Sequence, residues 1–182
     1  MIILASKSPR RRELLKYITD DFKIETCDAD ESLNDGISPY DAVLYLSRIK
    51  AQPIAKIHKN DIVIGADTVV AIDGKILGKP LDTTDAAHML KLLSGKTHSV
   101  FTGVTIIQGE KADSFYCETK VKFFDLTDKE IENYIKTGEP LDKAGAYGIQ
   151  GFGSLLVEKI DGDYFNVVGL PVSSLNRHLS NF

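Results

Sequence analysis

Polar and basic residues near the start of the chain have the types and spacing needed to bind a charged ligand. An apolar run over residues 2–5 leads into Ser6, Ser8 and three consecutive arginines, Arg10 to Arg12. A serine followed by proline is typical of a helix start, because serine caps the first amides and proline suits the first helical position. Helix-start amides, hydroxyls and guanidinium groups all bind phosphate well. The stretch therefore predicts a strand, a loop and a helix around an anion site; the alternatives are a solvated basic turn or a nucleic-acid patch.

An acidic residue interrupts the most apolar stretch of the chain. Asp67 lies within residues 61–72, a run typical of a strand that is buried on both faces. An ionised carboxylate in such a strand requires a cation, a metal or hydrogen bonds. After a turn at residues 73–74, the returning segment brings Lys79 back towards the same region, so Lys79 is the predicted counter-charge. The alternative is a structural aspartate that accepts backbone amides.

Further acids and a glycine-rich segment suit the same chemistry. A second acidic group occupies residues 28–32, where another predicted strand ends. Carboxylates for a divalent metal, facing cations for phosphate, are the general equipment of phosphoryl and nucleotidyl transfer. The long segment 139–153 contains four glycines among aromatic, amide and charged residues, which favours base and phosphate recognition. Its spacing is not that of a dinucleotide fingerprint, and residues 95–97 lack the first glycine of a P-loop.

Strands and helices that must position these residues follow from hydrophobic periodicity and capping signals. His98 is predicted to be structural, since no second histidine lies at ligand spacing. Pro53 is predicted to kink or end its helix. The predicted strands are 2–5, 22–26, 61–72, 75–80, a hairpin of two long strands around 108–110, 154–160 and 164–171; the predicted helices start at Pro9, Ser38, Asp82 and Thr127, with a short one from Val172.

Composition narrows the class of protein. The 182 residues, of which 43% are hydrophobic and 26% charged, predict an ordinary soluble globular chain. A net charge of −4 argues against a general nucleic-acid binder. The two cysteines, Cys27 and Cys117, form no paired motif, which favours a reducing compartment, with the cytosol as the default. The first apolar run is too short for a signal peptide and no stretch is long enough to span a membrane, so we expect a cytoplasmic protein.

Taken together and in order, six motifs resemble those of the Maf (septum formation inhibitor) family of nucleoside triphosphate pyrophosphatases. The last long motif is similar to the branch that acts on dTTP and UTP. The resemblance implies one domain over residues 1–182 with an α/β fold like that of the inosine triphosphatase group, in which an elongated mixed β-sheet flanked by helices forms two lobes around a central cleft. It also implies Mg²⁺ or Mn²⁺ dependence and often a homodimer. The motifs are residues 5–11, 65–70, 78–80, 93–98, 139–151 and 168–171.

The resemblance also implies roles for individual residues. Arg10, Thr68 and Gln150 would form the substrate-selecting set, although arginine also suits phosphate and Gln150 could simply stabilise its loop. Asp30 stands beside Glu31, where the family often has two acidic residues. Ser47-Arg48-Ile49-Lys50 departs from the more usual Arg-Glu-Lys run. The implied catalytic residues are Asp67, Glu31 and Lys79; the metal ligands are Glu31 and Asp67; the substrate contacts are Ser6, Ser8, Arg10, Arg11, Lys50, Thr68, Glu139 and Gln150.

Three hypotheses about function remain open at this point. The first is hydrolysis of dTTP, UTP or modified pyrimidine nucleotides to the monophosphate and pyrophosphate, with no nucleic-acid or membrane partner. The second is a non-enzymatic nucleotide-binding regulator of cell division, as the family name implies. The third, a nucleic-acid-binding domain that uses the arginines of the first helix, is disfavoured by the acidic total.

Overall fold

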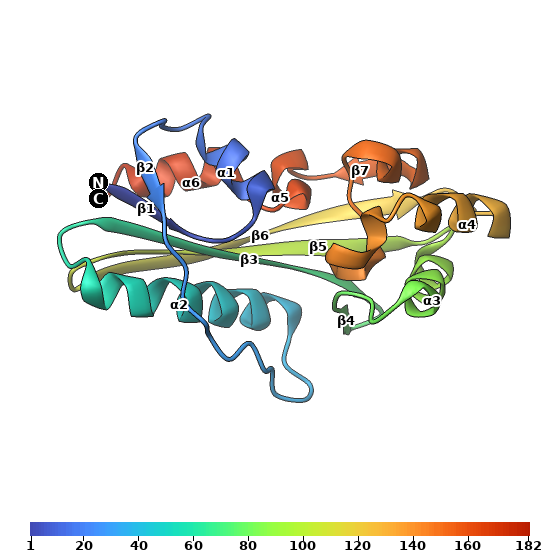
Figure 1. Ribbon diagram of the computed structural model, residues 1–182, viewed down its shortest axis with the longest axis horizontal. Helices are drawn as coiled ribbons and strands as arrows, with labels where there is room; N and C mark the ends of the chain where they lie inside the picture. The colour runs from blue at the N-terminus through green and yellow to red at the C-terminus, as the bar shows by residue number, and fades with distance from the viewer.

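A seven-stranded mixed sheet extends along the whole elongated molecule in the computed structural model, which describes residues 1–182 (Figure 1). The strand order is β2-β1-β3-β5-β6-β7, and β4 pairs with the end of β3. β1 is parallel to β2 and β3, whereas the remaining pairs are antiparallel. The strands are β1 (Ile2–Ala5), β2 (Phe22–Ile24), β3 (Ile62–Ile72), β4 (Lys75–Leu77), β5 (Thr97–Gln108), β6 (Lys111–Phe123) and β7 (Val157–Asp161).

Helices cover different parts of this sheet. α2 lies along one face, and α1, α5 and α6 lie on the other face near the chain termini (Figure 1). α3, α4 and the three short 3₁₀ turns of residues 139–156 surround the far end of the long strands, so the sheet carries two lobes (Figure 1). The helices are α1 (Pro9–Leu15), α2 (Pro39–Ile57), α3 (Thr83–Leu93), α4 (Asp128–Lys136), α5 (Tyr164–Val168) and α6 (Val172–Leu179), and the 3₁₀ turns are η1 (Glu139–Asp142), η2 (Ala144–Ala146) and η3 (Gly151–Leu156).

Each lobe has its own apolar core. In the lobe that holds both termini, side chains from β1, β3 and β5 pack against α1, α5 and α6, and Leu4, Ile64, Val104 and Leu175 are all fully buried. The far lobe is built around Phe123, which packs with residues of α3, α4 and η2. The long strands β3, β5 and β6 continue through both cores. They therefore hold the two lobes in a fixed relation.

Most sequence-predicted elements are confirmed, including the turn after β1. Ser8 caps α1 by accepting a hydrogen bond from the amide of Arg11. Thr127 and Glu130 form the reciprocal capping box of α4. Residues 95–97 follow a helix and not a strand, and the Gly95 amide donates to the carbonyl of Phe124, which agrees with the rejection of a P-loop.

Pro53 was predicted to kink or end its helix, and the second of these alternatives was wrong. α2 continues through Pro53 to Ile57. Proline has no amide hydrogen, so the carbonyl of Ile49, one turn earlier, loses its usual helical partner. The thiol of Cys27 lies 4.0 Å from that carbonyl oxygen and 3.7 Å from the carbonyl oxygen of Lys50. The thiol thus covers the part of the helix that proline leaves unpaired.

The C-terminal strand predictions were also partly wrong. Residues 164–171 do not finish the sheet, because Tyr164–Val168 form α5. Asp163 caps this helix by accepting from the Phe165 amide, and the Asn166 amide donates to the Val100 carbonyl and the Thr119 hydroxyl. Short apolar runs do not distinguish strand from buried helix by periodicity alone. The predicted strand over 154–160 starts only at Val157, because η3 occupies its first residues.

His98 is structural, as predicted, and its burial makes stability depend on pH. Its Nε2 atom lies 2.7 Å from the Tyr147 hydroxyl, its Nδ1 atom has no partner, and burial lowers its pKa to about 4. In the unfolded state, histidine takes up a proton near pH 6.5, whereas in the folded state His98 does so only near pH 4. The contribution of His98 to the unfolding free energy is therefore fully present above pH 6.5 and is lost as the pH drops towards 4. We expect a loss of about 2 kcal/mol in unfolding free energy between pH 7 and 5 from this residue. Urea unfolding at both pH values should show a smaller loss for His98→Gln; an equal loss in both proteins would contradict this assignment.

None of the helices combines the length and the apolar character needed to cross a membrane.

Candidate active site

A cleft of about 1010 Å³ separates the two lobes. This volume is at the upper end of the range for small-molecule sites. Its lining comes from β1, the start of α1, the loop after β2, the middle of α2 and β3, and the 3₁₀ turns of the far lobe. The structure therefore brings all the sequence-predicted site residues to one cavity: Ser6, Ser8, Arg10, Arg11, Glu31, Lys50, Asp67, Thr68, Lys79, Glu139 and Gln150.

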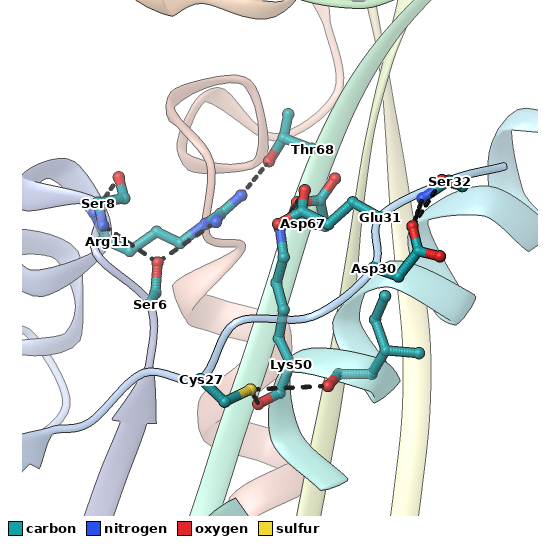
Figure 2. A network of polar contacts seen from close by, with 11 residues as sticks. Ser6, Ser8, Arg11, Cys27, Asp30, Glu31, Ser32, Lys50, Asp67 and Thr68 are labelled. Atoms are coloured by element: carbon teal, nitrogen blue, oxygen red, sulfur yellow. Dashed lines mark hydrogen bonds and ion pairs between the residues drawn. The ribbon is translucent and has the colours of Figure 1, made fainter. Parts of the chain in front are cut away.

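Two carboxylates on one side of the cleft share a single ammonium group. Lys50 Nζ forms an ion pair with Asp67 and lies 3.1 Å from Glu31 Oε2 (Figure 2). The side chains of Lys50 and Asp67 are 18% and 14% exposed, so this pair is shielded from water. The side chain of Glu31, which extends from a loop, is 56% exposed. The prediction of Lys79 as the counter-charge of Asp67 was wrong. Pairing of β4 with β3 stops at Leu77, and Lys79 lines the cleft beyond that point without an ion pair.

Two glycines allow α2 to lie close enough for Lys50 to reach Asp67. Gly65 on β3 faces α2, and a Cβ atom there would fall far inside van der Waals contact with the Ser47 carbonyl oxygen and 2.9 Å from the Cβ of Ala51. Gly103 on β5, opposite Asp67 in register, similarly faces the backbone of Val43. Because only glycine fits at these positions, the sequence of the strands sets the distance between helix and acid.

Arg11 also lines the cleft and is held by three acceptors. Its Nε donates to the Gly169 carbonyl at 2.8 Å, Nη1 to Ser6 Oγ at 3.4 Å and Nη2 to Thr68 Oγ1 at 2.9 Å. Figure 2 shows Arg11 reaching from α1 towards Thr68, beside the acids. Burial lowers the pKa of Arg11 below its usual value, and the charge of Asp67 opposes that shift. Arginine keeps its proton under such conditions, so the cleft contains a half-buried, oriented cation.

The glycine-rich segment forms a folded wall with one exposed amide. The Glu139 carboxylate accepts from the amides of Phe152 and Gly153 at 3.2 and 3.3 Å, which ties the two ends of the segment together. Gln150 lies between these anchors with its side chain exposed, at the edge of the cleft. Arg10 lies 3.7 Å from Asp142, an ion pair that connects α1 to η1 across the cleft. Sequence reasoning missed Asp142, which is one acid among many in the chain.

Thr102 is the other residue that sequence reasoning missed. It is fully buried on β5, directly opposite Thr68 in register, and its hydroxyl oxygen lies 2.8 Å from that of Thr68. The available signal was a hydroxyl residue among the apolar residues that alternate along this strand and point inward. A strand that only packs against the core does not need a hydroxyl group at such a position. A polar residue at such a position needs partners, and one of them, Thr68, lines the cleft.

The two carboxylates of the cleft fit a divalent cation that would also be bound by the phosphate groups of a substrate. Glu31 and Asp67 are the carboxylates close to each other, and no group of three or more histidine, cysteine or acidic side chains is arranged to hold a metal alone. Mg²⁺ commonly binds one or two carboxylates together with waters and phosphate oxygens. The two acids and an incoming triphosphate would together supply such ligands, next to the cations that a triphosphate also needs.

Comparisons with known proteins found full-length relatives and a solved structure of similar fold. A dTTP/UTP pyrophosphatase of Bacillus pumilus is 54% identical over 181 residues, covering 100% of this chain and 96% of the relative. A dTTP/UTP pyrophosphatase of Bacillus mycoides is 51% identical over 181 residues, covering 100% of this chain and 95% of the relative. The solved structure of the Staphylococcus aureus Ham1 protein superposes with a TM-score of 0.59 at 12% identity, covering 99% of this chain and 98% of that one.

The structural likeness confirms the predicted fold class, an α/β fold with an open mixed sheet flanked by helices. The family model described as Maf-like protein matches residues 1–182. Family match, full-length identity and cleft geometry all agree with the resemblance found in the sequence. The chain belongs to the Maf family.

Proposed function

We propose that this chain is a nucleoside triphosphate pyrophosphatase that cleaves dTTP and UTP between the α and β phosphates. The observation that carries the proposal is the cleft itself, in which Lys50 joins the Asp67 and Glu31 carboxylates and the half-buried Arg11 lies beside them. Acids that activate water and bind a cation, facing fixed positive charge, are what hydrolysis of a phosphoanhydride requires. The names of full-length relatives support the choice of dTTP and UTP.

In the proposed reaction, a water oxygen attacks the α phosphorus and the bond from that phosphorus to the bridging oxygen breaks. The bridging oxygen leaves with the electron pair as part of pyrophosphate. Asp67 accepts a proton from the attacking water through a carboxylate oxygen. Arg11, Lys50 and Lys79 stabilise the charge that develops on the departing pyrophosphate. Lys50 is available for this role once the two carboxylates have another cation to neutralise them.

Mg²⁺ or Mn²⁺ would be held by Glu31 and Asp67, where it would lower the pKa of bound water and neutralise phosphate charge. The proposal predicts that chelation of divalent cations by EDTA abolishes turnover. The competing hypothesis, a regulator that binds nucleotides without cleaving them, uses the same cleft. A panel of standard and modified nucleotides with Mg²⁺ separates the two: pyrophosphate released in step with monophosphate supports the enzyme, and tight binding without turnover supports the regulator.

Base selection by Gln150 is a further part of the proposal. Thymine and uracil present two carbonyl acceptors that flank one N–H donor, and an amide can pair with such an edge through both of its groups. For Gln150→Ala, we expect kcat/KM for dTTP and UTP to fall by an amount that corresponds to about 1–3 kcal/mol of lost transition-state stabilisation. The kcat/KM for poor purine substrates should change little. Steady-state kinetics with UTP, dTTP, ATP and GTP would check this. An equal fall for all four would place Gln150 on the phosphates or in the structure of its own loop.

Assembly and location extend the proposal. The family resemblance implies a homodimer, which sedimentation at several protein concentrations would check. Two free cysteines suit a reducing compartment, and we propose the cytosol, where nucleoside triphosphates are made and used.

A further inference from the structure

Thr102, which lies behind the cleft wall, has a fixed hydrogen-bond direction. Its hydroxyl oxygen lies 2.9 Å from the backbone carbonyl oxygen of Asn166 in α5 and 2.8 Å from the hydroxyl oxygen of Thr68. A carbonyl oxygen only accepts hydrogen bonds, and a threonine hydroxyl has only one hydrogen to donate. The hydrogen of Thr102 is therefore committed to Asn166. In its contact with Thr68, Thr102 can only accept.

The direction of the Thr68 hydroxyl follows from this. Thr68 must donate its single hydrogen to Thr102, away from the cleft, which leaves only oxygen lone pairs on the cleft side. One of these accepts the Nη2–H of Arg11 at 2.9 Å. The hydrogen bonds thus run in one direction, from Arg11 to Thr68, from Thr68 to Thr102 and from Thr102 to the backbone of α5.

We propose that Thr102 is a positioning residue for the reaction: by fixing the direction of the Thr68 hydroxyl, it fixes the guanidinium of Arg11. This proposal rests on the proposed function, because it treats Arg11 as the cation that stabilises the departing pyrophosphate. Two of the five N–H groups of Arg11 have no partner among its contacts with Gly169, Ser6 and Thr68. Those two remain for phosphate oxygens.

Burial explains why the direction matters. Thr102 is fully buried, and Arg11 is half-buried with its guanidinium held by Gly169, Ser6 and Thr68. In such surroundings water does not readily replace a missing partner, and an unpaired polar group costs about 1–3 kcal/mol. If Thr102 could not accept, the Thr68 hydrogen would be free to rotate towards Arg11, where a donor would face a donor. The guanidinium would then lose its third anchor.

The matched substitutions are Thr102→Val and Thr102→Ser. Valine keeps the branched shape but removes the acceptor, whereas serine keeps the hydroxyl and removes a methyl group. For UTP and dTTP alike, we expect Thr102→Val to lower kcat about tenfold with little change in KM, because the lost interaction acts on charge that develops in the transition state. Thr102→Ser should retain most of the kcat of the unaltered protein. Thr102→Ala removes the same hydroxyl and serves if the valine variant does not fold.

A double-mutant cycle tests the pathway. If Thr102 acts only through Thr68, the kcat of Thr68→Val/Thr102→Val should equal that of Thr68→Val alone. Additive losses, an unchanged kcat in Thr102→Val, or an equal loss in Thr102→Ser would overturn the proposal. Failure of the unaltered protein to release pyrophosphate from any nucleotide would instead contradict the proposed function, and with it this extension.

Discussion

Replacing Asp67 with Asn is expected to lower kcat for UTP on the order of 10²-fold or more while the protein stays folded. Asparagine keeps the size and much of the hydrogen bonding of aspartate, but it cannot accept the proton of the attacking water or contribute charge to a metal site. Lys50 keeps its second partner, Glu31, at 3.1 Å. The melting temperature should be unchanged or raised, since a functional charge shielded from water often lowers stability.

The control for this experiment is Asp30→Asn. Asp30 precedes Glu31 in the same loop, but its carboxylate accepts from the amide and hydroxyl of Ser32, which lowers its pKa, and it does not line the cleft. Its removal should change kcat little. Near-normal turnover by Asp67→Asn would remove Asp67 from the mechanism and leave a structural role for the ion pair with Lys50.

A large loss of stability is expected for Gly65→Ala. The added Cβ would overlap the Ser47 carbonyl and approach Ala51, and both belong to the helix that carries Lys50. Because the neighbouring atoms are largely backbone, α2 must move away from β3, and we expect a loss of about 3 kcal/mol in unfolding free energy. Moving α2 also separates Lys50 from Asp67, so kcat/KM should fall in the protein that remains folded.

Gly78→Ala is the matched control for stability. A Cβ at Gly78 meets nothing within 4 Å, and its backbone is not in the left-handed region. Urea unfolding should place this variant within about 0.5 kcal/mol of the unaltered protein. If Gly65→Ala were equally stable, the close approach of α2 to β3 would not be what sets the position of Lys50.

Local signals in the sequence predicted much of the fold because they depend on neighbouring residues. Ser8 before a proline, and Thr127 three residues before Glu130, mark helix starts through contacts within one turn, and both are confirmed. The strand prediction for residues 164–171 failed because tertiary contacts decide that segment. Asn166, whose buried amide bonds to β5 and β6, holds a short helix there that the run of apolar residues does not indicate.

The contents of the cleft were predicted better than its internal pairing. Residue types and family motifs identified the lining, but they assigned the wrong lysine to Asp67. Lys79 is nearer in sequence, whereas Lys50 reaches Asp67 because Gly65 allows a helix to lie against the strand. The link from Arg11 through Thr68 to Thr102 likewise depends on strand register. Contacts of this kind join distant parts of the chain and leave no local pattern.

Product analysis of UTP turnover in ¹⁸O-labelled water tests the central claim most directly. Attack of water on the α phosphorus predicts UMP and pyrophosphate in equal amounts, with ¹⁸O incorporated into UMP alone, and ³¹P NMR with mass spectrometry can read both. Formation of UDP and orthophosphate would mean that a different bond is cleaved. Label in pyrophosphate would place the attack on the β phosphorus and contradict the assignment of Arg11, Lys50 and Lys79 to the departing group.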